Sequence, residues 1–170
     1  MNKKVRFWVN AAVTAAIYVA LTHLQYFLLP GSATWFIQFR IAEALCILAY
    51  FTPAAIPGLA VGCALFNLSY AGALPLDFLV GSLASFLAAW GMWKSRAVTI
   101  KGYPLPGMLL PAAANAVLVG WELSVYIGGT FWLNALYVAI GEAAVLLTLG
   151  SLLYYALRKR DLGRLLFDRR

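Results

Sequence analysis

The chain has 170 residues, of which 64% are hydrophobic and only 11% are charged. Soluble domains carry roughly a quarter of their residues charged, and no soluble core of this size could bury so much apolar surface, so an integral membrane protein is expected. The net charge of +7 would suit nucleic acid, but the basic residues lie in short clusters between apolar runs, as juxtamembrane charges do. One integral membrane domain is therefore predicted over residues 1–170, with no room for a soluble catalytic domain.

Turn residues divide the apolar sequence into six segments. A membrane-crossing helix needs about 20 mostly apolar residues, and the first run ends at Pro30-Gly31-Ser32. Two prolines and a glycine mark a tight turn over residues 52–58. The predicted spans are 7–29, 37–51, 58–70, 77–93, 106–126 and 131–157. The predicted fold class is an all-α membrane protein, a bundle of six transmembrane helices.

Lysine and arginine predict the orientation of this bundle. Clusters at residues 3–6, 94–101 and 158–170 hold twelve of the thirteen basic residues, and cytoplasmic loops are enriched in such residues. Placing all three clusters inside requires four crossings before the second cluster and two after it, which agrees with the six segments. Both termini and the basic loop are therefore expected in the cytoplasm. The expected outer loops are 30–36, 71–76 and 127–130, and the turn at 52–58 is expected inside.

The segments at 37–51 and 58–70 are short for full spans. They could instead form a re-entrant hairpin that enters from outside, and the positions of both termini would not change. Backbone at membrane depth must be hydrogen-bonded by protein or must line a water-filled cavity. Either arrangement therefore places these two helices against the rest of the bundle.

Five charged residues remain inside or beside the predicted spans: Arg40, Glu43, Asp77, Glu122 and Glu142. Charges within a membrane are costly and usually functional. All but Glu142 lie toward the outer side. The uncharged polar and aromatic residues on that side are Asn67, Asn134, Gln38, Trp35, Trp121, Trp132, Tyr70 and Tyr126. Together these residues predict an outward-opening polar pocket with aromatic walls, suited to a small ring compound that is cationic or donates hydrogen bonds.

Most of these residues also have a structural interpretation. Arg40 and Glu43 are three apart on one helix, a spacing that pairs opposite charges. Asp77 could cap the fourth helix, because its carboxylate can accept from free backbone N–H groups there. Trp121 and Trp132 could belong to the interfacial belt of aromatic residues.

Two glutamates remain open between structural and ligand-binding roles. Glu122 has no cation nearby on its own helix, so it pairs with Arg40 on another helix or faces a ligand. Glu142 lies about 16 Å along the sixth helix, near mid-membrane, and could pair with Arg40, share a proton or form the pocket floor. Asn115 lies on the same helix face as Glu122 and is expected to hydrogen-bond a neighbouring helix.

The sequence offers little for catalysis. His23 is the only histidine, and a general base needs a partnered geometry. The sequence has no phosphate-binding loop ending in Gly-Lys-Ser/Thr, so ATP that drives transport would be hydrolysed by another protein. Cys46 and Cys63 have no zinc-ligand spacing, and no metal site is expected. A small intramembrane enzyme and a passive channel are the rival classes, although a channel should carry polar residues through both halves of the bundle.

Short motifs in order along nearly the whole chain, from about residue 12 to 157, carry a family resemblance. They read Ala-Ile-Tyr-Val-Ala-Leu-Thr at 16–22, Gln-Phe-Arg-Ile-Ala-Glu-Ala-Leu at 38–45, Thr-Pro-Ala-Ala-Ile-Pro-Gly-Leu at 52–59, Gly-Cys-Ala-Leu-Phe-Asn-Leu at 62–68, Asp-Phe-Leu-Val-Gly-Ser-Leu-Ala at 77–84, Val-Gly-Trp-Glu-Leu at 119–123 and Phe-Trp-Leu-Asn-Ala-Leu-Tyr-Val-Ala-Ile-Gly-Glu at 131–142. With these motifs the chain resembles the QueT family, substrate-binding (S) components of energy-coupling factor (ECF) transporters.

The resemblance implies a six-helix fold in the bacterial plasma membrane, with the substrate site near the outer face. It implies a complex with one transmembrane coupling protein and two ATPase subunits, which would hydrolyse the ATP, so no cofactor is expected in this chain. The implied substrates are queuosine precursors: deazaguanine bases with an aminomethyl or nitrile arm, or queuine. Another small vitamin-like ring compound is the alternative.

The resemblance also implies roles for particular residues. The alanine motif that S components press against the coupling protein maps on Ala12 and Ala16, although ordinary alanines in a membrane helix have the same spacing. A guanine-like ring offers adjacent donors that one carboxylate can accept together, an aminomethyl cation would favour a second carboxylate, and aromatic side chains would stack on the ring. The candidate substrate-binding residues are Glu122, Glu142, Asn134, Trp121, Trp132, Arg40, Glu43, Asp77 and Asn67, and none is expected to be catalytic.

Overall fold

The computed structural model describes residues 2–32 and 37–159, which form helices joined by turns. The tail after residue 159, with its four arginines, and residues 33–36 of the first expected outer loop lie outside the described residues. The elements are α1 (Lys3–Leu28), η1 (Ile41–Ile47), α2 (Leu48–Phe51), α3 (Ala55–Ser69), α4 (Asp77–Ser95), α5 (Leu105–Tyr126), α6 (Phe131–Val145), η2 (Leu146–Gly150) and α7 (Ser151–Lys159). Of these, η1 is a 3₁₀-helix and η2 is a π-helical turn.

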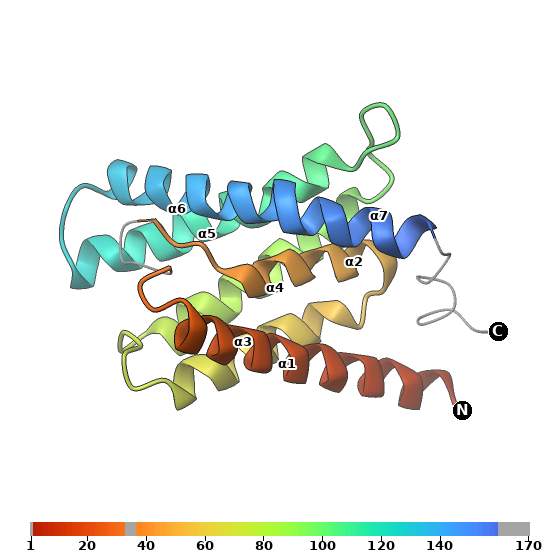
Figure 1. Ribbon diagram of the computed structural model, residues 1–170, viewed down its shortest axis with the longest axis horizontal. Coiled ribbons are helices and arrows are strands. Elements are labelled where there is room, and N and C mark those ends of the chain that lie inside the picture. The colour runs from red at the N-terminus through yellow and green to blue at the C-terminus, as the bar shows by residue number, and fades with distance from the viewer. Residues whose placement is uncertain (1, 33–36, 160–170) are drawn as a thin grey trace.

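The long helices pack in chain order. α1 packs on α3, α3 on α4, α4 on α5 and α5 on α6. Figure 1 shows α6, η2 and α7 as one continuous rod along the top of the bundle. The short η1–α2 segment lies in the middle and touches α1, α3, α4, α5, α6, η2 and α7. This central segment is therefore covered by other helices on every side.

The two ends of the bundle differ in character. The start of α1, the 96–104 loop and the end of α7 lie toward one end, and the turns at 70–76 and 127–130 lie toward the other (Figure 1). Arg158 fixes α7 to the basic loop by donating to the Gly102 carbonyl oxygen at 2.9 Å. The described parts of all three basic clusters therefore share one end of the molecule, as the sequence predicts.

The central segment differs from its prediction. A helix was expected over 37–51, but the structure has a 3₁₀-helix over Ile41–Ile47 followed by one α-helical turn over Leu48–Phe51. A 3₁₀-helix rises about 2.0 Å per residue, compared with 1.5 Å in an α-helix, so few residues cover more length. Glu43, Cys46 and Ile47 are each 0% exposed, which places the segment inside the bundle. Whether it counts as a span or as half of a re-entrant hairpin stays a prediction.

The turn before α3 is shorter than the sequence suggested. Pro57 was expected in the turn, but it lies in the first turn of α3, where its missing N–H would have had no helical partner. Thr52 ends α2, and its hydroxyl oxygen accepts from the Ala54 N–H at 3.3 Å. On α3, Gly58 and Gly62 let α1 approach closely: a Cβ at Gly62 would lie 2.8 Å from the Tyr18 Cβ.

The outer surface of the bundle is apolar. Within the described residues, Lys3–Leu28, Leu105–Tyr126 and Phe131–Lys159 are long and apolar enough to cross a membrane. Ile41–Phe51 and Ala55–Ser69 are apolar but shorter. Many large apolar side chains point outward. Among them are Phe27, Leu68 and Leu152, which are 82%, 66% and 69% exposed. Such a surface needs lipid around it, so this is an all-helical membrane protein.

The contact between α6 and the residues before η1 gives a test of the packing. A methyl group at Gly141 would lie 2.5 Å from the Gln38 backbone oxygen and 2.9 Å from its carbonyl carbon. Backbone atoms cannot give way cheaply, and overpacking costs about 1–3 kcal/mol. Gly141→Ala should therefore lower the thermal unfolding temperature of the detergent-purified protein by several degrees.

Gly91→Ala is the matched control for that variant. The nearest atom to its added methyl is the Leu110 Cδ1, at 3.2 Å, which sits at the end of a flexible side chain and can move. Its unfolding temperature should stay close to that of the wild type. Equal losses in the two variants would contradict the close approach of α6 to Gln38.

Candidate functional site

A cavity of about 360 Å³ lies at the end of the bundle away from the basic clusters. Its walls come from the last turns of α1, the segments on either side of residues 33–36, the end of α3, the 72–77 loop and the end of α5. Ligand sites typically measure roughly 300–1,000 Å³. The cavity therefore has room for one small ring compound.

Three aromatic side chains make one wall of the cavity. Tyr26 comes from α1, and Phe66 and Tyr70 come from the end of α3. Phe66 and Tyr70 are stacked with ring centroids 5.4 Å apart, and Tyr26 lies 4.7 Å from Tyr70 and 5.4 Å from Phe66. This cluster offers flat apolar surface to a planar ring.

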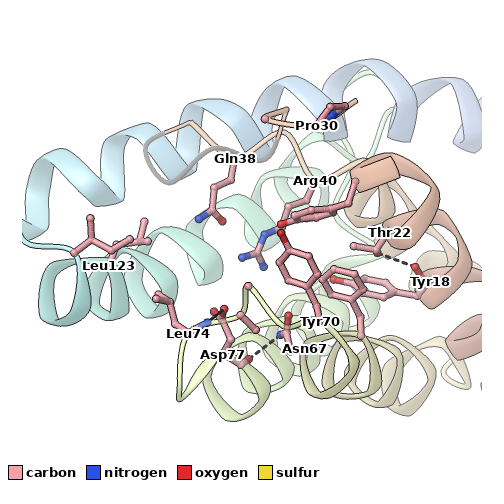
Figure 2. Close-up of a pocket in the computed structure, with 16 residues that line it drawn as sticks. Tyr18, Thr22, Pro30, Gln38, Arg40, Asn67, Tyr70, Leu74, Asp77 and Leu123 are labelled. Atoms are coloured by element: carbon pink, nitrogen blue, oxygen red, sulfur yellow. Dashed lines mark hydrogen bonds between the residues drawn. The ribbon is translucent and has the colours of Figure 1, made fainter. Parts of the chain in front are cut away.

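Arg40 brings a positive charge into the same space. Figure 2 shows its guanidinium reaching into the cavity between Gln38 and Asp77, with the Tyr70 ring close by. The spacing of Arg40 and Glu43 allowed an ion pair between them, but Glu43 makes other contacts. Its Oε1 accepts from the Tyr18 hydroxyl at 2.9 Å, and its Oε2 accepts from the Cys46 thiol at 3.3 Å. The Arg40 guanidinium therefore remains available to a ligand.

Asp77 also lines the cavity, but it does not cap α4 as the sequence suggested. It is the first residue of the helix, and Leu76 occupies the cap position. The Asp77 Oδ2 instead accepts from the Leu74 N–H at 2.6 Å, which closes the 72–77 loop. Asn67 holds the same corner from α3 by donating to the Asp77 backbone oxygen at 2.8 Å. Both side chains point toward the cavity in Figure 2.

Glu122 and Glu142 are not among the residues that line the cavity. They are 0% and 1% exposed, and within the described residues none of their four carboxylate oxygens has a hydrogen-bond partner. Among the described residues, no ion pair between Glu122 and Arg40 is formed. An unpaired buried polar group costs about 1–3 kcal/mol, and a charged one costs more.

Asn115 is also buried without hydrogen-bond partners. It is 1% exposed, and neither atom of its amide has a partner among the described residues. The hydrogen bond to a neighbouring helix that the sequence suggested is therefore not formed. Gln38 Oε1 and Ser85 Oγ are buried without partners as well. Of the residues with such unpartnered atoms, Gln38 lines the cavity.

The remaining candidates lie away from the cavity. Trp121 and Trp132 are 49% and 79% exposed and are not among the residues that line it, so the aromatic wall comes from α1 and α3 instead. Asn134 is buried, but its amide donates to Ser124 Oγ and the Gly128 carbonyl oxygen, each at 3.0 Å. Asn134 therefore holds the turn between α5 and α6.

Sequence reasoning missed several cavity residues that one signal could have found. Tyr18, Thr22 and Tyr26 follow one another at intervals of four along α1, and all line the cavity. Phe66, also missed, has the same spacing on α3 from Tyr70, which the sequence analysis places on the outer side. Residues four apart share a helix face, so aromatic and polar residues at that interval mark faces turned toward a cavity.

The alanines of α1 fall on two different faces. Ala11 and Ala15 are each 6% exposed and contact Gly58 and Gly62 of α3. Ala12 and Ala16 are exposed on the outside of the bundle. The second pair is therefore free to meet another protein, whereas the first pair holds α1 on α3.

The contrast between Glu43 and Glu142 can be tested with one substitution at both positions. Glu43→Leu would leave the Tyr18 hydroxyl and the Cys46 thiol without their acceptor, at a cost of about 1–3 kcal/mol. Glu142→Leu removes an unpaired buried carboxylate and should leave stability unchanged or increase it. Thermal unfolding in detergent should therefore show a loss only for Glu43→Leu, and equal losses would mean that Glu142 has a structural partner.

Comparison with known proteins adds one finding. The chain is similar over residues 8–159 to a family model described as QueT transporter. No curated protein and no solved structure matches it.

Proposed function

Because the chain belongs to the QueT transporter family, we propose that it is the substrate-binding component of an ECF importer and captures a queuosine precursor in the cavity. The observation that carries this proposal is the combination, in one small cavity, of an aromatic wall with Arg40 and Asp77. A purine-like ring needs both a flat surface and a set of charged edge partners. The alternative substrate is another small vitamin-like ring compound with similar donors.

The cavity offers a partner for each part of a deazaguanine ring. The faces of the ring would stack on Phe66 and Tyr70, an interaction worth about 1–3 kcal/mol per base in other proteins. The ring carbonyl oxygen would accept from Arg40, which is the common partner of that oxygen in guanine recognition. The adjacent N–H and amino groups would donate to the acidic side of the cavity, where Asp77 lies on the wall and Glu122 is close behind it.

The proposed orientation places this cavity outside the cell. The basic clusters at the opposite end of the bundle favour the cytoplasm, and six crossings would put both termini there. In that orientation the apolar surface of the bundle spans the bilayer, and the turns at 70–76 and 127–130 face outward. A substrate from the medium would then reach the cavity without crossing the membrane.

The direct experiment measures binding of guanine analogues to the purified protein in detergent. Aminomethyl- and nitrile-bearing deazaguanines and queuine should bind at a single site, whereas adenine should not, because its edge places a donor where Arg40 needs an acceptor. Thiamine and riboflavin are suitable competitors for the alternative of another vitamin. Tight binding of one of these, with no binding of any deazaguanine, would contradict the proposed substrate class.

Two substitutions test the assigned contacts. Glu122→Gln keeps the shape of the side chain but offers only one good acceptor, so affinity should fall at least about a hundredfold. Phe66→Leu removes a stacking surface and should cost about tenfold, whereas Trp90→Leu, which removes an aromatic ring from the outer face of α4, should bind as the wild type does. Unchanged affinity in Glu122→Gln would leave Asp77 as the acceptor on this side.

Capture alone does not move a substrate across the membrane, and the sequence has no phosphate-binding loop of its own. We therefore propose that a transmembrane coupling protein and two ATPase subunits supply the energy. The exposed pair Ala12 and Ala16 is the proposed contact with the coupling protein, because small residues let membrane helices approach closely. The neighbouring exposed residues of α1 are apolar, as such a contact needs.

Ala12→Leu and Ala16→Leu test this contact. A bulky group there should block uptake by cells that contain the partner proteins, while the isolated protein binds substrate normally. Ala15→Leu is the contrasting variant: Ala15 faces Gly62, so leucine should lower thermal stability by forcing α1 away from α3. If Ala12→Leu lost binding as well as uptake, the exposed face would belong to the internal packing of the bundle instead.

A further inference from the structure

The side chain of Gln25 connects the end of α1 to the segment that carries Arg40. Gln25 is buried, and its amide bonds to three groups that lie outside α1. Its Oε1 accepts from the Ile41 N–H at 2.8 Å. Its Nε2 donates to the Ser32 Oγ at 2.9 Å and to the Phe39 carbonyl oxygen. One buried side chain therefore holds the chain on both sides of residues 33–36.

Two of these bonds fall on either side of Arg40. The Phe39 carbonyl belongs to the peptide group that precedes the Arg40 Cα, and the Ile41 N–H belongs to the peptide group that follows it. Each peptide group is planar, so fixing both planes fixes the two backbone dihedrals of Arg40. These dihedrals are extended, with φ −85° and ψ 96°. Gln25 therefore sets the direction in which the Arg40 side chain leaves the backbone.

Neighbouring contacts hold the same segment without replacing these two bonds. The Phe39 N–H donates to the Ser32 carbonyl oxygen at 3.1 Å, and the Arg40 carbonyl oxygen accepts from the Glu43 N–H at 3.0 Å. The backbone of Gln38 packs closely against α6 at Gly141. The Phe39 carbonyl and the Ile41 N–H, in contrast, are bonded by the Gln25 amide.

The position of the Arg40 guanidinium depends on this backbone. Arg40 extends from the segment into the cavity, between Gln38 and Asp77 (Figure 2). A binding group must be held within about 0.5 Å of its productive position to contribute fully. A side chain that is already oriented also loses less conformational entropy when the ligand binds. A residue that orients Arg40 therefore raises affinity without touching the ligand.

We propose that Gln25 is a positioning residue, which bonds both peptide groups that flank Arg40 and thereby holds the guanidinium toward the ring carbonyl of the ligand. Gln25 itself is not among the residues that line the cavity, so its effect on binding acts through Arg40. This inference rests on the proposed capture of a deazaguanine ring.

The test is a double-mutant cycle on the purified full-length protein, with the nitrile-bearing deazaguanine as ligand. Gln25→Met keeps the length of the side chain and removes all three bonds, so affinity should fall about tenfold. In the Arg40→Gln background the same substitution should change affinity by less than about twofold, because no guanidinium is left to position. The thermal unfolding temperature should fall by similar amounts in both backgrounds, since the same bonds are lost.

Asn134→Leu is the matched control. Asn134 is also a buried amide at this end of the bundle, but it bonds to Ser124 and to the Gly128 carbonyl oxygen in the α5–α6 turn. Its loss should lower the unfolding temperature and leave affinity within about twofold of the wild type. If Asn134→Leu weakened binding as much as Gln25→Met does, the effect would be a general consequence of lost stability, and the positioning role would be wrong.

The other outcomes separate this inference from the proposed function. If the wild type binds the ligand and Gln25→Met either has no effect or costs the full factor in the Arg40→Gln background as well, the positioning role is wrong and capture of the ring stands. If the wild type binds no deazaguanine, the proposed function fails, and hydrogen exchange tests the hold on Arg40 by itself. Peptides that cover residues 37–43 should then exchange faster in Gln25→Met than in the wild type or Asn134→Leu, and equal exchange would overturn the hold.

Discussion

Glu43, Glu122 and Glu142 are each at most 1% exposed in a protein whose outer surface is apolar. Removing a carboxylate from water costs several kcal/mol, and of these three only Glu43 recovers part of that cost through hydrogen bonds within the described part of the chain. The packing of the apolar helices must offset the rest. Such a cost is consistent with a site that becomes fully bonded only when a ligand supplies the donors, and the proposed function depends on this constraint.

Close backbone contacts hold these charges together. Gly58 and Gly62 bring α1 against α3, which sets Tyr18 beside Glu43. Gly141 brings α6 against the Gln38 backbone, so Glu142 lies near Arg40. The central η1–α2 segment carries Glu43 into the middle of the bundle, where seven other elements contact it. The same small residues that let the helices approach one another therefore also place the acidic groups around a single arginine.

Hydropathy and the positions of the basic clusters were sufficient to predict the helices and to group the described basic residues at one end of the bundle. They could not show the 3₁₀ geometry of η1 or place Pro57 inside α3, because both depend on packing against neighbours. The direction in which Trp121 and Trp132 face was also beyond the sequence. A helix in lipid is apolar on both sides, so periodicity does not separate the face turned to the bundle from the face turned to lipid. For the same reason Tyr26 and Phe66 read as ordinary membrane residues, although Thr22 and Tyr70, each four residues away from one of them, lie on the same cavity faces.

The most direct measurement is an experimental structure of the purified protein with a bound aminomethyl-deazaguanine. The proposed function predicts the ring against Phe66 and Tyr70 with its carbonyl oxygen on Arg40. A ligand bound instead at the opposite end of the bundle, among Tyr103, Tyr154 and the basic loop, would contradict the proposed capture site.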